Sequence, residues 1–482
     1  MRKSKIFIGN GQDIKFTILS GNVKMISQIK KLGGRKMKKR TKKLVALFMA
    51  AMMVGSLAGC GGSKDSSSDS SAAEGGSGDS KEIVFWNIGT EEVDKAIYDK
   101  AIETFNSTTE SGYTVSSVPV QNDNYKEKLV IAMSSGECPD MYMSWSGGPM
   151  NEYIESGYAQ PITDLFNNSE LPDRLIDAAI EQAKYKDEIY AVPYMNISIS
   201  GIYYNTEIFE KYNLEVPTTI SELEAVCDTL VENGITPFAL ANGPKWTGSM
   251  YFMNLAARYG GLEPFQEAVA GTGSFEDECF IKAGETIQNW VEKGYFPEGC
   301  NSLSEDDGQA RQMLYQETAA MSLAGSWYTS MMQQDSKEFA AKMGWFAFPA
   351  ADDANTDASI LIGTVGDNFI SFNCEGEKLD AAFECATKFS EDDQIDFMIE
   401  SGKIPPIKGV DEKLSDETSK TIMQAVNNAS AVQLWYDQYL PPAVASVHLD
   451  TCQEIFGMTM TPEEAAKQFQ QAMEEYNADK AE

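Results

Sequence analysis

Histidine is almost absent from this chain of 482 residues, in which His448 is the only one. This scarcity excludes metal sites built from several histidines, and it excludes Ser-His-Asp and Cys-His catalytic arrangements unless His448 is the base. The chain also has no G-x-S-x-G or Walker-type Gly-Lys-Ser/Thr motif, which the corresponding enzymes require. For His448 we expect a surface or partly packed position. The sequence therefore predicts a protein without catalytic activity, metal or cofactor.

Closely spaced cysteine pairs are missing too. None of the eight cysteines forms the C-x-x-C spacing of a zinc or redox site. Seven remain after Cys60, an odd number, and we expect most of them to be small buried side chains. A disulfide between Cys279 and Cys300 stays open as an alternative.

No apolar run is long enough to span a membrane, which takes ~20 residues. The run from 44 to 54 follows the basic segment 38–43 and leads through small residues to Leu57, Ala58, Gly59 and Cys60. This is the order of a secretory signal, although a buried apolar helix ending at a chance Gly-Cys is the alternative. The segment resembles a bacterial lipoprotein signal. That resemblance implies cleavage before Cys60, lipidation of Cys60 and an anchor at the extracellular face of the cell membrane.

The segments around this signal have simple compositions. Residues 37–59 make a signal peptide of ordinary length, so we expect translation to start at Met37, with Met25 as the other candidate, and residues 1–36 to be a mis-called extension. Residues 60–81 are rich in Ser, Gly and Asp. They cannot bury enough apolar surface to fold, so we expect a flexible tether.

Basic residues are few. The chain has 39 Lys and Arg against 72 Asp and Glu, a formal charge of −33, and 14 of the 39 basic residues lie before Cys60. Such an acidic surface repels nucleic acid and anionic lipid headgroups. We therefore expect neither as a ligand.

The folded part begins with alternating strand and helix patterns. Strands are predicted at 82–89, 113–120 and 139–145, with helices at 93–105 and 125–133 between them. This order predicts an α/β fold with a largely parallel sheet, and ligands bind at the carboxyl ends of such strands. The residues at those ends are Trp86, Asn87, Trp145 and Ser146.

An ordered series of short motifs extends over most of this folded part. The motifs are NYKEKL (124–129), SSGECPD (134–140), GYAQPITDL (157–165), IYAVP (189–193), GIYYNTEIF (201–209), PTTISEL (217–223) and AAMSLAGSW (319–327), followed by Phe389, Ser390, Gly402 and Pro405. Each motif alone is weak, but the series resembles the family 1 extracellular solute-binding proteins from Ile83 to about Met473.

The resemblance implies a two-lobed periplasmic-binding-protein-like fold (type II) with discontinuous lobes joined by hinge crossings. The first lobe would comprise 82–196 and 364–412, and the second 197–363 and 413–482. The chain would cross between lobes at 192–202, at 360–368 and near Gly409. The implied partner is the permease of an importer of the ATP-binding cassette type, and we expect a monomer.

Tryptophan supplies the first set of candidate binding residues. Indole faces stack on the apolar faces of sugar rings, and the indole N–H can donate a hydrogen bond. Five tryptophans stand next to small or polar residues, namely Trp86, Trp145, Trp246, Trp327 and Trp435. Trp327 and Trp435 also resemble stacking aromatics of maltose-binding-like family members. For Trp290 and Trp345, which lie in apolar patterns, we expect core positions.

Polar candidates come from predicted loops and crossings. Sugar hydroxyls need carboxylate and amide partners, and the candidates are Asn87, Asp123, Asn196, Asn242 and Asp367. A solvated turn or a helix cap is the alternative for each. Asp367 stands where many relatives have only small residues, so a hydroxyl or a cationic group of the ligand could explain it.

These observations predict a lipid-anchored, non-enzymatic receptor that delivers a carbohydrate, most simply an oligosaccharide, to its importer. One alternative keeps the fold and changes the ligand to a cationic or other polar solute. A surface glycosidase would need a carboxylate pair at a defined separation. A purely structural or adhesive lipoprotein is the last alternative, and the ordered motifs disfavour it.

Overall fold

The computed structural model describes residues 5–8, 12–15, 81–352 and 356–481. The chain divides into two compact units, Met1–Ser77 and Gly78–Glu482. In the first unit, β1 (Lys5–Ile8) and β2 (Gln12–Lys15) form an antiparallel pair. The predicted signal peptide, Cys60 and the tether up to residue 80 lie outside the described residues.

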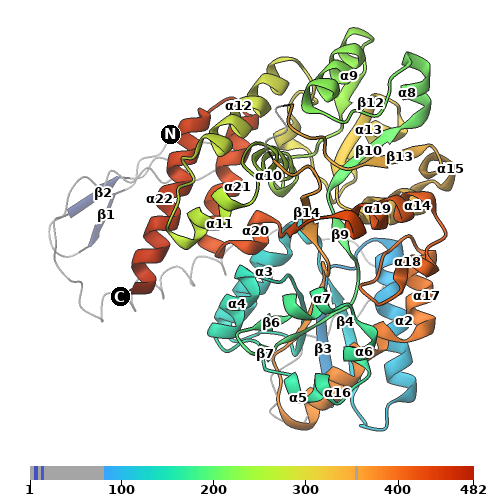
Figure 1. The fold of residues 1–482 in the computed structure, drawn as a ribbon. Helices are drawn as coiled ribbons and strands as arrows, with labels where there is room; N and C mark the ends of the chain where they lie inside the picture. The colour runs from blue at the N-terminus through green and yellow to red at the C-terminus, as the bar shows by residue number, and fades with distance from the viewer. Residues whose placement is uncertain (1–4, 9–11, 16–80, 353–355, 482) are drawn as a thin grey trace, which may run out of the picture. The chain divides into compact units, whose positions relative to one another are not determined.

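The second unit contains two main sheets, each at the centre of a lobe (Figure 1). The sheet of the first lobe has the strand order β4-β3-β5-β15-β8. Its strands are β3 (Glu82–Asn87), β4 (Thr114–Pro119), β5 (Met141–Ser144), β8 (Ala191–Pro193) and β15 (Phe369–Phe372). Strands β3, β4 and β5 pair in parallel, and β15 runs antiparallel to β5 and β8. The predicted strand–helix alternation and parallel start of the sheet are confirmed.

Helices surround this sheet (Figure 1). They are α2 (Glu92–Thr108), α3 (Asn122–Ser135), α4 (Gly148–Glu155), α5 (Thr163–Asn167), α6 (Leu171–Arg174), α7 (Asp177–Gln182), α16 (Gly376–Thr387), η2 (Lys388–Ser390), α17 (Asp392–Glu400) and α18 (Val410–Lys413). A small hairpin is formed by β6 (Lys184–Tyr185) and β7 (Glu188–Ile189).

The sheet of the second lobe has the order β11-β12-β10-β13. Its strands are β10 (Gly201–Asn205), β11 (Thr236–Phe238), β12 (Ala319–Ala324) and β13 (Met343–Phe346). The helices of this part of the chain are α8 (Thr206–Tyr212), α9 (Ile220–Glu232), α10 (Trp246–Gly260), α11 (Glu263–Ala270), α12 (Glu278–Glu292), η1 (Cys300–Ser302), α13 (Gln309–Tyr315), α14 (Trp327–Asp335), α15 (Lys337–Ala340), α19 (Glu417–Asn428), α20 (Tyr436–Tyr439), α21 (Pro442–Phe456) and α22 (Pro462–Ala481).

A third, small sheet connects the two lobes. It has the order β16-β14-β9, formed by β9 (Ser198–Ile199), β14 (Leu361–Thr364) and β16 (Val432–Gln433). Strands β9 and β14 lie within the predicted crossings 192–202 and 360–368, and they pair antiparallel. Gly363 permits their close approach, because a Cβ there would lie 2.2 Å from the carbonyl oxygen of Ser198. The lobe boundaries themselves stay a prediction.

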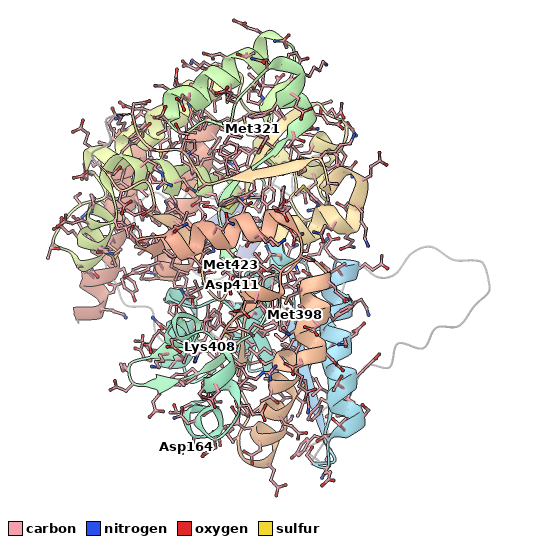
Figure 2. The ribbon with its side chains drawn as sticks, turned by 45° about the vertical axis from the view of Figure 1, so that its right-hand side comes forward. Asp164, Met321, Met398, Lys408, Asp411 and Met423 are labelled. Carbon is pink, nitrogen blue, oxygen red and sulfur yellow. The ribbon has the colours of Figure 1, made fainter. Side chains whose placement is uncertain are left out.

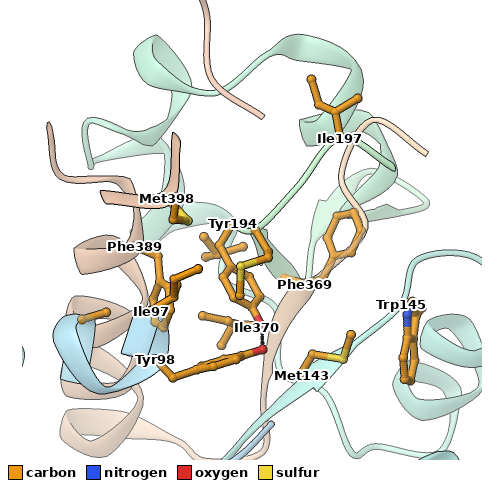
Figure 3. Packing of buried hydrophobic residues seen from close by; sticks show 14 of the residues in the cluster. Ile97, Tyr98, Met143, Trp145, Tyr194, Ile197, Phe369, Ile370, Phe389 and Met398 are labelled. Atoms are coloured by element: carbon orange, nitrogen blue, oxygen red, sulfur yellow. Dashed lines mark hydrogen bonds between the residues drawn. The ribbon is translucent and has the colours of Figure 1, made fainter. Parts of the chain in front are cut away.

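An aromatic cluster forms part of the hydrophobic core of the first lobe (Figure 3). Tyr98 of α2 and Tyr194 pack edge-on against Phe389, with ring centroids 5.8 and 4.8 Å away, and the two tyrosine hydroxyls share a hydrogen bond. All three side chains are buried. This packing fixes α2 against the segment after β8, so the residues before and at the start of α2 have a defined position.

His448 is buried, so the expectation of a surface or partly packed position is wrong. It is 1% exposed and packs against the rings of Phe252, Tyr436 and Phe469. Its Nε2 lies 2.7 Å from Ser249 Oγ, and burial lowers the pKa of His448 to about 4. This serine–histidine pair lies in the core, since Ser249 is 0% exposed.

The seven cysteines from Cys138 onward are free thiols, so the possible Cys279–Cys300 disulfide is not formed. Six of them are buried and Cys138 is partly buried, as expected for small apolar side chains. Trp290 and Trp345 are buried in the core, which confirms their prediction. Within the described residues, no helix is both long and apolar enough to cross a bilayer.

Candidate functional site

A cavity of about 290 Å³ is lined by residues of both lobes and of the crossing segments. The lining residues from the first lobe include Ile88, Thr90, Glu91, Asp94, Asn122, Asp123, Lys126 and Trp145. From the second lobe come Trp246, Glu305, Asp306, Arg311 and Trp327, and the crossing segments add Asn196, Asp367, Asn368 and Lys403. Trp435, Asp437 and Gln438 also line the cavity. The cavity therefore lies at the edge where β3 and β5 end, as predicted for a sheet of this type.

Three tryptophans form a continuous aromatic wall. The ring centroids of Trp246 and Trp327 are 5.8 Å apart, and those of Trp327 and Trp435 are 5.9 Å apart, with interplanar angles of 69° and 56°. Trp435 is buried, whereas Trp246 and Trp327 keep part of their surface exposed. Aromatic faces arranged this way offer an apolar surface on which a ring can stack.

The chain holds Trp327 in place through the turn between β12 and α14. A Cβ on Gly325 would lie 2.0 Å from the Trp327 ring, so only glycine leaves room for the indole there. Trp145, after β5, meets the edge of Tyr125 at a centroid distance of 5.8 Å, and Lys126 Nζ lies 4.6 Å from its ring centre. One face of Trp145 is thus occupied by a cation of the chain itself.

Each basic residue of the cavity lining is paired with a carboxylate. Lys126 Nζ lies 2.7 Å from Asp437 and Lys403 Nζ lies 2.6 Å from Asp94. Arg311 lies among Asp335 at 3.1 Å, Glu305 at 3.6 Å and Glu91 at 3.8 Å. Each of these cations therefore already has at least one carboxylate partner within the chain.

Burial raises the pKa of several carboxyl groups of the lining. It raises the pKa of Glu305 to about 7, against the opposing effects of Arg311 and a hydrogen bond from Tyr328. It likewise raises the pKa of Asp306 and of Asp367 to about 6, and raises that of Asp123. Removal from water disfavours the charged form, so a ligand that compensates these charges would be stabilised here.

The two lobes contact each other across the cavity. Asp306 Oδ2 accepts a hydrogen bond of 2.8 Å from the backbone N–H of Asp123, in the first turn of α3. A carboxylate at a helix N-terminus is favoured by the helix dipole. Trp246 Nε1 donates to Asp123 Oδ1 at 3.4 Å, so Asp123 connects to two segments of the other lobe. These contacts describe a closed arrangement of the lobes.

Seven of the ten predicted site residues line the cavity: Asp123, Trp145, Asn196, Trp246, Trp327, Asp367 and Trp435. Asn196 is buried, and its amide holds the crossing segments together, because Oδ1 accepts from Ile404 N at 2.7 Å and Nδ2 donates to Ser198 Oγ at 3.2 Å. Although Asn196 lines the cavity, its side chain therefore mainly holds the backbone of the neighbouring crossing segments in place.

The other three predicted residues are not part of the described lining. Trp86 is partly buried against the core of the first lobe. Asn87 is buried, and its Nδ2 donates a hydrogen bond to Ser117 Oγ while its Oδ1 accepts one from Gly89 N. Asn242 Oδ1 accepts from Gly248 N at 2.8 Å and its Nδ2 donates to Asn301. Asn87 and Asn242 thus hold local turns, the alternative that the sequence left open.

Several lining residues were not among the residues predicted from the sequence. Glu91 and Asp94 stand at the start of the helix after β3, where the rule for parallel sheets would have placed them. Gln438 lies three residues after Trp435, a candidate already named. Arg311 and Lys403 have no sequence signal, because only the folded chain brings them to Glu305 and Asp94.

Comparison with known proteins gives one family match. The model of the family described as bacterial extracellular solute-binding protein matches residues 89–394. An uncharacterised ABC transporter extracellular-binding protein of Pyrococcus horikoshii is 29% identical over 206 residues, 42% of this chain and 46% of that protein. The xylose/arabinose-binding protein of Haloferax volcanii is 22% identical over 48% of this chain and 50% of its own length. The chain thus spans about half the length of these two relatives.

Other relatives and structures match over longer segments. The multiple sugar-binding protein of Streptococcus mutans is 26% identical over 58% of this chain and 69% of its own length. A solved structure from work on xylan utilization by Caldanaerobius polysaccharolyticus is 28% identical, with a TM-score of 0.75 over 81% of this chain and 99% of that one. A chitin oligosaccharide binding protein has a TM-score of 0.74 at 22% identity, covering 83% and 100%. The predicted two-lobed α/β fold is confirmed.

Proposed function

Because the chain belongs to the family of bacterial extracellular solute-binding proteins, we propose that it binds a carbohydrate in the cavity between its lobes and delivers it to an ATP-binding cassette importer. The observation that carries the proposal is the wall of Trp246, Trp327 and Trp435. The sugar-binding names of several relatives support the same ligand class.

The size of the cavity supports a short saccharide. Its volume of about 290 Å³ stands near the lower end of the ~300–1,000 Å³ range of ligand pockets. We therefore propose a small oligosaccharide or a monosaccharide as the ligand, bound without chemical change. The excess of carboxylates in the lining supports a cationic or other polar solute as the second candidate.

A thermal-shift screen tests this function. A ligand that binds only the folded state stabilises it by RT ln(1 + [L]/Kd), or about 2.7 kcal/mol at 100 times Kd. We expect mono- and disaccharides to raise the melting temperature of the C60A protein, which cannot be lipidated, whereas amino acids and unsubstituted polyamines should not. A response to polyamines with none to any sugar would contradict the proposal. Chromatography of the incubated sugars would reveal any cleavage.

We further propose that Cys60 carries the lipid that holds this receptor at the membrane. A single acyl chain binds a membrane only weakly, and stable anchoring takes two attachment signals, such as several acyl chains on one cysteine. If Cys60 is the residue that carries these chains, its substitution should release the protein from the membrane. In cells expressing the natural chain we expect it in the membrane fraction, labelled by a radioactive fatty acid. The C60A variant should lose the label and appear in the medium or the soluble fraction. Labelling of C60A equal to that of the natural chain would contradict the assignment.

A further inference from the structure

The charges of the cavity lining do not balance. Seven acidic side chains line it against three basic ones, and all three basic residues are already ion-paired. Asp123, Asp306 and Asp367 are the acids that have no lysine or arginine within ion-pair distance among the described residues. Partial burial disfavours the charged form of these carboxyl groups and raises their pKa, so a ligand bearing positive charge would bind here with a favourable electrostatic contribution.

Asp123 and Asp306 are engaged in the contact between the lobes. Asp306 accepts from the N–H of Asp123, which in turn accepts from the indole N–H of Trp246. Asp367 lies instead on the crossing segment after β14, where its backbone N–H donates to Asn196 O at 2.9 Å. Its carboxylate accepts hydrogen bonds from Ser198 and Gln438. Of the three, Asp367 is therefore the carboxylate that stands outside the Asp123–Asp306–Trp246 contact, and its hydrogen-bond partners Ser198 and Gln438 are both neutral.

Gln438 supplies a second acceptor beside Asp367. A carboxylate can only accept hydrogen bonds, so Gln438 must use its NH₂ group toward Asp367. Its carbonyl oxygen Oε1 is then the buried atom that has no hydrogen-bond partner, although Gln438 is 6% exposed and lines the cavity. A buried acceptor left unpaired costs ~1–3 kcal/mol, which a donor on the ligand would recover.

The chemistry of these two acceptors favours one kind of donor. An ammonium group has three N–H donors, no acceptor and a full positive charge, so it satisfies both oxygens and compensates the carboxylate. A neutral hydroxyl has one O–H and leaves the charge uncompensated. The aromatic wall of Trp246, Trp327 and Trp435 completes a site for a ring that carries such a group.

We infer that the saccharide bound by this protein carries a protonated amine, whose nitrogen lies against the Asp367 carboxylate and the Gln438 carbonyl oxygen. This inference rests on the proposed function and specifies its substrate class as an amino sugar. Lys403 and Asp437 are the other charged groups acting on Asp367, and each is ion-paired, with Asp94 and Lys126 respectively.

Titration calorimetry on the C60A protein tests this inference at pH 7.5. The ligands are glucosamine, galactosamine and the β-1,4-linked glucosamine disaccharide, each compared with its N-acetylated form and its neutral parent sugar. We expect at least one amine to bind tenfold or more tighter than both counterparts. The D367N substitution should reduce that affinity about 10- to 100-fold, as for a hydrogen bond to a charged group, and should reduce the preference for the amine over its neutral parent sugar.

The pH dependence supplies an independent readout. Burial raises the pKa of Asp367 to about 6, so its carboxylate is charged at pH 7.5 and becomes protonated below pH 6. Affinity for the amine should therefore fall as the pH drops from 7 to 5. D367N should weaken this dependence, and the part that remains comes from Glu305 and Asp306, whose pKa values burial raises to about 7 and about 6 in the same cavity. D164N changes the net charge equally at Asp164, an exposed residue of α5 that is labelled in Figure 2 and does not belong to the cavity lining, and should behave like the natural chain.

The outcomes separate the two proposals. Neutral or N-acetylated sugars that bind as tightly as the amines, or a D367N protein with unchanged amine preference, would overturn the amine assignment and leave the sugar receptor intact. Absence of binding to every sugar, amine-bearing or not, would overturn both. Melting curves of D367N and D164N establish that each variant is folded.

Discussion

Trp327→Ala should lose most of its carbohydrate affinity while keeping its fold. The indole stands in the middle of the aromatic wall, between Trp246 and Trp435, and part of its surface remains exposed. Truncation of a central aromatic residue in a binding site costs ~2 kcal/mol or more, which corresponds to an affinity about 30-fold lower. Calorimetry with the best sugar from the thermal-shift screen would measure it.

Two further variants make this result specific. Trp327→Phe retains an aromatic face and should keep affinity within about tenfold of the natural chain, because stacking area is only partly lost. Trp86→Ala removes a tryptophan outside the described lining and should leave affinity unchanged wherever the variant folds. If Trp327→Ala bound the sugar within twofold of the natural chain, the stacking role of this residue would be refuted.

Arg311→Met should cause the largest loss of stability. Arg311 is 4% exposed, and Glu305 beside it is 6% exposed. Breaking a buried ion pair by removing one partner typically costs ~3–5 kcal/mol, because the other charge is left buried and uncompensated. A melting temperature about 5 °C or more below that of the natural chain is expected in differential scanning calorimetry.

The pH dependence of that loss follows from Glu305. Its pKa is already raised to about 7 by burial, with Arg311 acting in the opposite direction. Without Arg311 the pKa of Glu305 rises further. At pH 8 the folded state must then either bury the charged Glu305 carboxylate without a partner or bind a proton, and both cost free energy, whereas at pH 5 the Glu305 carboxyl is already neutral. The deficit of Arg311→Met should therefore shrink as the pH falls from 8 to 5.

Two controls distinguish burial from loss of charge. Lys408→Ala removes an exposed cation whose partner Asp177 is also exposed, and such pairs contribute ~0–1 kcal/mol (Figure 2). Its melting temperature should stay within a degree or two of the natural chain. The double variant R311M/E305Q should recover much of the loss, since it removes the buried charge as well. An Arg311→Met protein as stable as Lys408→Ala would contradict this account.

Local patterns were sufficient to predict the start of the fold. Strand β3 alternates buried and partly exposed residues, and the helices α2 and α3 follow it with helical spacing of apolar residues. The same period of two indicates why Asn87 is not at the site: it shares the buried face of β3 with Ile83 and Phe85. His448 similarly follows Val444 and precedes Cys452 at helical spacing on the buried face of α21, a signal that the sequence analysis did not use.

The rest of the site depends on assembly over long separations. Arg311 meets Glu91 across the lobes, and Lys403 meets Asp94 about three hundred residues away in the chain. No spacing rule relates such positions, because their distance is set by how two sheets and a crossing sheet are arranged. Tryptophans were easier to identify, since each lies beside small or polar residues in its own segment.

The pairing of β9 with β14 restricts how the lobes can move. Register pairs Gly363 with Ile199 and Thr364 with Ser198, and the missing Cβ of Gly363 lets the two backbones touch. Sliding one strand along the other would break these hydrogen bonds, whereas bending both strands together preserves them. We therefore expect these two connections to bend together, as one unit, in any movement of the lobes.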